Sequence, residues 1–196
     1  MEMNNDLPLK FNASYDFFIH EILPLKKRKN IYFKKNSYFL YINAEQNCRG
    51  YNLSYLHLIK IEPKEHYVNY PCRLGKPIAE CDTKCDINSR INIFNPIIYR
   101  SVQCVYRANN IFNLRRLLDI IETQDRTNVK EWYNYKTKRI FYRLEDSGID
   151  YLAIFELKGK QERKHLTLIS AFPVFDEKMK KVYDKQYQNF KDAVIK

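Results

Sequence analysis

The sequence predicts an α+β protein in which helices pack on a four-stranded antiparallel sheet, next to a small N-terminal α+β lobe. Three observations favour this class. Short segments rich in Tyr, Ile, Phe and Leu follow one another between turn residues, apolar and polar side chains alternate in two of these segments, and apolar side chains recur at helical spacing before and after them. The expected strands span residues 128–136, 138–145, 150–157 and 163–172.

Residues 1–70 are expected to form the N-terminal lobe. Apolar side chains at helical spacing precede Pro24, which predicts a helix that ends there. Residues 31–42 are typical of a hairpin, and residues 52–61 are typical of a further strand.

Residues 71–89 are expected to form a connecting loop, because Pro and Gly interrupt the apolar pattern there. Residues 90–196 are expected to form the main domain. Asn95 before Pro96 predicts the start of its first helix, and Asn113 the start of its second, since Asn is a favoured cap and Pro a favoured first residue. The second helix should bury Leu114, Leu117, Leu118 and Ile121.

The closing helix of this domain is expected to begin at Asp176 as N-cap, shortly after Pro173. Its apolar residues recur at helical spacing. The side chains expected to be buried are those of Met179, Val182, Tyr183, Tyr187, Phe190 and Val194. A stripe of Tyr and Phe at this spacing is typical of a core or an interface, so we expect the helix to pack on the sheet.

In the second and fourth expected strands apolar and other side chains alternate, and successive side chains of a strand point to opposite faces of the sheet. The side chains expected under the helices are those of Ile140, Leu144, Leu166 and Leu168. The side chains expected on the opposite face are those of Arg139, Arg143, His165 and Thr167. Because this second set combines cations with groups that form hydrogen bonds, it favours a phosphate-binding surface.

The formal charge of +11, from 34 Lys and Arg against 23 Asp and Glu, favours an anionic partner through counterion release. The excess of positive charge is spread along the chain, so no segment stands out as a basic arm. The charge therefore permits nucleic-acid binding without requiring it.

The five cysteines are an odd number for a disulfide framework. A zinc site usually shows two closely spaced cysteine pairs, whereas the only closely spaced pair in this chain is Cys81 with Cys85. We expect free thiols, no structural metal and no cofactor. No run approaches the roughly 18 apolar residues that span a bilayer. We therefore expect a cytoplasmic protein with no membrane partner.

Two motifs resemble a family of nucleases. Residues 90–98 are similar to the opening of the phage branch of the barnase, EndoU, colicin D and RelE-like ribonucleases, and residues 168–174 resemble the last strand of that branch. In that strand Ser170 replaces Thr and Phe172 replaces Tyr. The resemblance covers residues 86–192 and implies two helices followed by a four-stranded antiparallel sheet.

The resemblance implies cleavage of RNA without a metal, through attack of the 2′-hydroxyl on the adjacent phosphate. It also implies RNA as partner, with tRNA as one candidate, and a role as a toxin or a phage or host-conflict effector with a neutralising protein partner. The expected catalytic residues are His165, Arg143, Glu145 and Thr167. The expected RNA-binding residues are Arg139, Lys138, Trp132, Tyr135 and Ser170.

Each role has a structural alternative. The alternative for His165 is an exposed strand histidine, for Arg143 a cross-strand ion pair, and for Trp132 sheet packing. Thr167 and Ser170 fall on opposite faces under strict alternation unless a bulge intervenes. A module of similar shape that binds nucleic acid or protein without catalysis is the main alternative function, and an immunity-like partner protein is a third.

Overall fold

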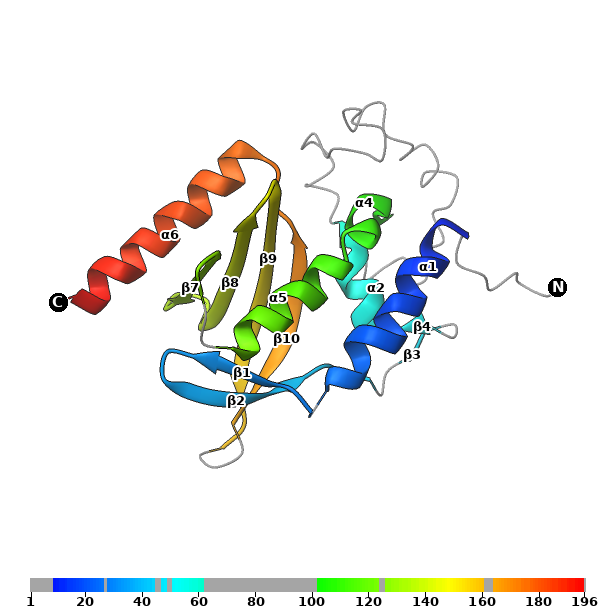
Figure 1. Cartoon of the computed structure of the whole chain (residues 1–196), viewed down its shortest axis with the longest axis horizontal. Helices are drawn as coiled ribbons and strands as arrows, with labels where there is room; N and C mark the ends of the chain where they lie inside the picture. The colour runs from blue at the N-terminus through cyan, green and yellow to red at the C-terminus, as the bar shows by residue number, and fades with distance from the viewer. Residues whose placement is uncertain are drawn as a thin grey trace.

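The computed structural model describes residues 9–26, 28–44, 47–48, 51–61, 102–123, 126–160 and 164–195. Within these ranges the central element is a six-stranded mixed sheet with helices on both faces (Figure 1). The strands, in their order across the sheet, are β1 (Asn30–Phe33), β2 (Asn36–Tyr41), β10 (His165–Pro173), β9 (Ile149–Lys158), β8 (Arg139–Asp146) and β7 (Val129–Asn134).

The α+β class is confirmed, whereas the four-stranded antiparallel sheet is wrong. β7 to β10 form the expected antiparallel meander, and β2 then pairs with β10 in parallel, so the N-terminal hairpin extends the same sheet. Leu40 lies opposite Leu166 in this pairing. The period of two shows that a segment is a strand but carries no information about which sheet it joins.

The described helices are α1 (Leu9–Phe17), α2 (Leu53–Ile59), α4 (Val105–Asn109), α5 (Phe112–Glu122) and α6 (Glu177–Ile195). α1 continues into a π-helical turn and a 3-10 turn, η1 (Phe18–Ile22) and η2 (Leu23–Leu25). Two short strand pairs, β3 (Asn47–Cys48) with β4 (Tyr51–Asn52) and β5 (Lys60–Ile61) with β6 (Val102–Gln103), complete the described elements.

The inner face of the sheet is the face that packs against α5, α1 and α2. Ile140, Leu144 and Leu166 are fully buried there, and Leu168 packs against them, as the alternation predicts. The predicted stripe of α5 is also confirmed, because each of its four residues, Leu114, Leu117, Leu118 and Ile121, is buried in the same cluster. Burial of each Leu or Ile side chain contributes about 1.5–3 kcal/mol, so this cluster dominates the stability of the fold.

The outer face is the opposite face, and α6 covers part of it. The buried cluster between α6 and the sheet contains Trp132, Phe141, Leu152, Ile154, Phe172 and Val174. Met179, Tyr183, Tyr187 and Phe190 of α6 pack against this cluster as predicted. Val182 and Val194, however, are 53% and 55% exposed, so their predicted burial is wrong. They lie off the stripe that faces the sheet.

The expected start of α6 is confirmed, because the Asp176 carboxylate accepts a hydrogen bond of 2.9 Å from the backbone N–H of Met179. The expected strand over 52–61 is mostly wrong, because this segment forms α2. The Asn52 side chain accepts hydrogen bonds from the N–H groups of Ser54 and Tyr55 and so caps the first turn. Tyr55 and its buried neighbours place the helix in the inner core.

Residues 62–101 lie outside the described residues, and with them the expected loop 71–89, the helix start at Asn95 and the motif of residues 90–98. The division into residues 1–70, 71–89 and 90–196 therefore stays a prediction. Of the helices that the structure describes, none has the length and the hydropathy to cross a membrane.

Candidate nucleic-acid interface

A row of mostly polar side chains crosses the outer face beside α6. The strand register places Thr167 opposite both Tyr41 and Glu156, Glu156 opposite Arg139, and Arg139 opposite Asn134. Because directly opposite residues share a face, the polar row consists of these five side chains from five adjacent strands. Sequence reasoning could place its residues on a face but could not align the strands.

A bulge in β10 brings Ser170 to the same face as Thr167. The register between β10 and β9 shifts between Leu168 and Ser170, so Ser170 lies opposite Ile154, an outer-face residue. Strict alternation would have placed the two hydroxyls on opposite faces. Within the described residues, the side-chain oxygen of Thr167 is buried without a hydrogen-bond partner.

Aromatic side chains flank the polar row on β2 and β10. Phe39 lies opposite His165 and is 57% exposed. The rings of His165 and Tyr41 have centroids 5.2 Å apart, and the Lys26 ammonium lies 5.3 Å from the centre of the Tyr41 ring. Phe39 and Tyr41 were missed from the sequence, although the burial of Leu40 between them implies that both point to the other face.

Basic residues gather at one end of the sheet. β8 begins beside the end of β9, so the β7–β8 and β9–β10 connections lie at the same end of the sheet. β2 runs parallel to β10, so both strands begin at that end, and the β1–β2 connection lies there too. We call this the cationic end; its basic residues are Lys34, Lys35, Lys136, Lys138, Arg139, Lys158, Lys160 and Lys164. Tyr135, in the β7–β8 turn, is 63% exposed among them. The carboxylate of Glu156 pairs with Lys158 at 3.2 Å.

The Arg143 side chain lies under α6 and is 1% exposed. Its guanidinium donates a bidentate pair of hydrogen bonds to Asp150, at 2.7 and 2.6 Å, and a bond of 3.0 Å to Asp184 of α6. Glu145 lies 3.0 Å from the same guanidinium and 2.6 Å from Lys130. Because these carboxylates occupy the guanidinium, Arg143 is not available to clamp a phosphate.

Electrostatics within this ion network stabilise its charged forms. Burial alone would raise the pKa of Asp184, but hydrogen bonds and charges from Lys130 and Arg143 outweigh it and hold the pKa below its usual range. Burial likewise opposes a charged Lys130, yet its bonds to Asp184 and Glu145 raise the pKa above its usual range. Lys130 and Asp184 therefore stay charged at neutral pH, and the network joins α6 to β7, β8 and β9.

The structure thus separates the predicted site residues into two groups. The residues on the outer face outside the ion network of α6, or at the cationic end, are His165, Thr167, Ser170, Arg139, Lys138 and Tyr135. Of these, Thr167 is buried. The residues under α6 or in its ion network are Arg143, Glu145 and Trp132. The Trp132 side chain is buried and stacks on Phe141, with the two ring centroids 5.1 Å apart, and its expected role in RNA binding stays a prediction.

Among the described residues, no cluster of His, Cys, Asp and Glu is arranged to hold a metal ion, and the Cys104 side chain is buried. Cys72, Cys81 and Cys85 lie outside the described residues, so the expectation of no structural zinc stays a prediction.

No protein family, no curated protein and no solved structure matches this chain.

Proposed function

We propose that the protein binds single-stranded RNA at the cationic end and on the part of the outer face beside it. The observation that carries the proposal is the position of Phe39 and Tyr135, two strongly exposed aromatic side chains, among the basic residues of one sheet end. Both rings are exposed enough for an unpaired base to stack on them.

The charge of the cationic end suits a phosphate backbone. Lys34, Lys35, Lys136 and Lys138 are exposed on turns, where their ammonium groups can follow a flexible strand without being desolvated. Each phosphate that such a group neutralises releases condensed counterions, which gives affinity without sequence preference. The ion pair of Glu156 with Lys158 leaves most of this charge uncompensated.

The aromatic residues favour a single strand over a duplex. Bases can stack on Phe39 and Tyr135 only where they are not already paired and stacked, and each such contact is worth about 1–3 kcal/mol. The Thr167 hydroxyl also belongs to the polar row, but its oxygen is buried, so RNA can reach it only if the residues around it move.

Cleavage of the bound RNA is a second proposal, favoured by the position of His165. The imidazole lies on the outer face of β10, two residues before Thr167. Glu156 of β9 and Arg139 of β8 follow across the sheet. His165 would take the proton of a 2′-hydroxyl, whose oxygen attacks phosphorus while the 5′-oxygen leaves with a proton from a second acid. Arg139 replaces Arg143 as the cation that stabilises the developing charge.

The binding proposal is tested with a fluorescently labelled single-stranded RNA, whose anisotropy is measured over a range of salt concentrations. Lys136→Glu with Lys138→Glu should weaken binding and reduce the slope of log affinity against log salt by roughly 0.7 for each phosphate that the variant no longer neutralises. Phe39→Ala should weaken binding by about 1–3 kcal/mol. Lys181→Glu, an exposed position on α6, is the matched control and should change affinity little.

The cleavage proposal is tested by incubation with RNA in EDTA and analysis for a 2′,3′-cyclic phosphate end. His165→Ala should lower the rate on the order of a hundredfold, the usual scale for a general base. An unchanged rate in this variant would exclude His165. Tight, salt-dependent binding without any cleavage by the parent protein would leave the binding function alone.

A further inference from the structure

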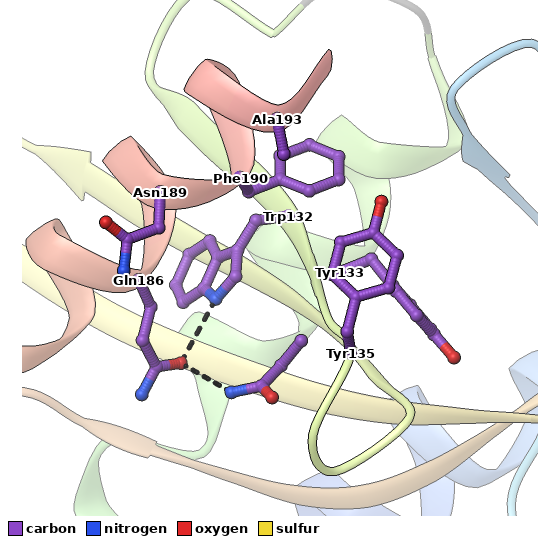
Figure 2. A pocket seen from close by; sticks show the side chains of 8 residues that line it. Trp132, Tyr133, Tyr135, Gln186, Asn189, Phe190 and Ala193 are labelled. Atoms are coloured by element: carbon purple, nitrogen blue, oxygen red, sulfur yellow. Dashed lines mark hydrogen bonds between the residues drawn. The ribbon is translucent and has the colours of Figure 1, made fainter. Parts of the chain in front are cut away.

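A recess lies between β7 and the C-terminal half of α6, next to the cationic end. Its volume is about 160 Å³. Trp132 and Tyr135 contribute rings from the strand side, and Gln186, Asn189 and Phe190 line it from the helix. Figure 2 shows the two amide side chains on one side of the recess and Tyr135 on the other.

Hydrogen bonds fix the amide of Gln186. The indole N–H of Trp132 and the side-chain N–H of Asn134 both donate to the Gln186 side-chain oxygen, at 3.3 and 3.1 Å. Asn134 is itself held, because its side-chain oxygen accepts from the N–H groups of Lys136 and Thr137 in the β7–β8 turn. The Gln186 amide nitrogen therefore keeps a set direction.

The Gln186 nitrogen and the Asn189 amide have no hydrogen-bond partner among the described residues. The recess thus combines aromatic walls with free amide donors and an amide acceptor. This is the chemistry by which proteins read an unpaired base, because rings stack on its faces and amides bond to its edge.

The size and the surrounding charge fit a single nucleotide. A volume of about 160 Å³ lies below the roughly 300–1,000 Å³ of pockets for drug-sized ligands, and therefore suits one planar heterocycle. The Lys34 ammonium lies 5.3 Å from the centre of the Phe190 ring, so a cation stands at the edge of the recess. Lys136 follows Tyr135 in the turn and provides a second cation for the phosphate.

We infer that this recess holds one nucleobase of the bound RNA, with its phosphate toward Lys34 and Lys136. The inference rests on the proposed function and adds to it a base-reading site that is separate from the polar row. Trp132 is the only Trp of the chain, so its fluorescence reports directly on the recess.

The test is a fluorescence titration of the full chain with AMP, CMP, GMP and UMP, with ribose 5-phosphate as the probe that lacks a base. At least one nucleotide should change the Trp132 signal saturably, and ribose 5-phosphate should not. Ala193→Leu places a larger side chain in the recess and should abolish the response. Gln188→Ala, on the same helix outside the recess, should keep it.

An equal response to ribose 5-phosphate, or loss of the response in Gln188→Ala, would overturn the inference. Binding of the labelled RNA separates it from the proposed function. If Ala193→Leu binds RNA as tightly as the parent, the recess holds no base of that RNA while the binding function stands. If the parent binds no RNA but still responds to nucleotides, the proposed function fails and the recess remains a nucleotide site.

Discussion

Arg143 and Arg139 lie on the same face of β8, yet their surroundings differ completely. Arg143 is enclosed by Asp150, Glu145 and Asp184, whereas Arg139 lies in the polar row beyond the cover of α6. The shared face was predictable from the alternation in the sequence. The difference in their surroundings was not predictable, because it depends on where α6 crosses the sheet. The sequence of β8 carries no information about the position of α6.

Replacement of Arg143 by Met should lower the free energy of unfolding by up to about 3–5 kcal/mol, because it leaves the Asp150 carboxylate, which is only 17% exposed, without its bidentate cation. Arg139→Met is the matched control at a half-buried position outside the ion network and should cost below about 1 kcal/mol. Urea unfolding followed by Trp132 fluorescence measures both. Equal costs in the two variants would contradict the buried ion network.

The pKa of Asp184 predicts how stability depends on pH. Because the folded pKa lies below the unfolded value of 3.8, the carboxylate contributes stability that is present above that value and lost as the pH falls through the folded pKa. Asp184→Asn should reduce stability at neutral pH and flatten the acid limb of the curve. Urea midpoints in a pH series measure this, and Asp192→Asn controls for the loss of an exposed carboxylate on the same helix.

At the scale of elements, α6 is the helix that the sequence predicted most completely. Its N-cap, its span and the residues Met179, Tyr183, Tyr187 and Phe190 were predictable because capping and periodicity are local. α2 was missed although Asn52 offered a cap, because its aromatic and branched residues also suit a strand. The parallel pairing of β2 with β10 joins residues far apart in the chain, so no short sequence pattern predicts it.

Removal of the N-cap should weaken the packing of α6. Asp176→Ala leaves the N–H of Met179 without its acceptor and should cost about 0.5–2 kcal/mol. The measurement is the free energy of unfolding from urea denaturation. Asp192→Ala, an exposed position later in the helix, should change stability by less than about 0.5 kcal/mol. A larger effect at Asp192 would argue against the cap.

At the scale of the whole molecule, the inner core joins elements from both ends of the chain. Phe18 of η1 is buried in the same cluster as Ile140 of β8. A core of this kind should unfold in one step, even though the sequence suggests a division into two lobes. The sequence indicated the members of this core through their periodicity but not that the two halves share it.

Phe18→Ala tests this coupling. The substitution should cost about 3–5 kcal/mol, and it should shift the Trp132 fluorescence transition and the circular dichroism transition to the same urea concentration. Trp132 lies in the other half of the chain, on the other face of the sheet. If only the dichroism signal moved, the N-terminal elements would form an independent unit. Phe17→Ala, at a half-buried neighbour, should cost less.

The parallel pairing of β2 with β10 has a consequence for synthesis. The hairpin of β1 and β2 is complete at residue 41, but its neighbour in the sheet begins only at residue 165. During translation one edge of β2 has no strand partner until β10 emerges, and an unpaired strand edge can pair with other chains. Closing so long a loop also slows folding. We therefore expect the nascent chain to depend on chaperones in a way that the finished protein does not.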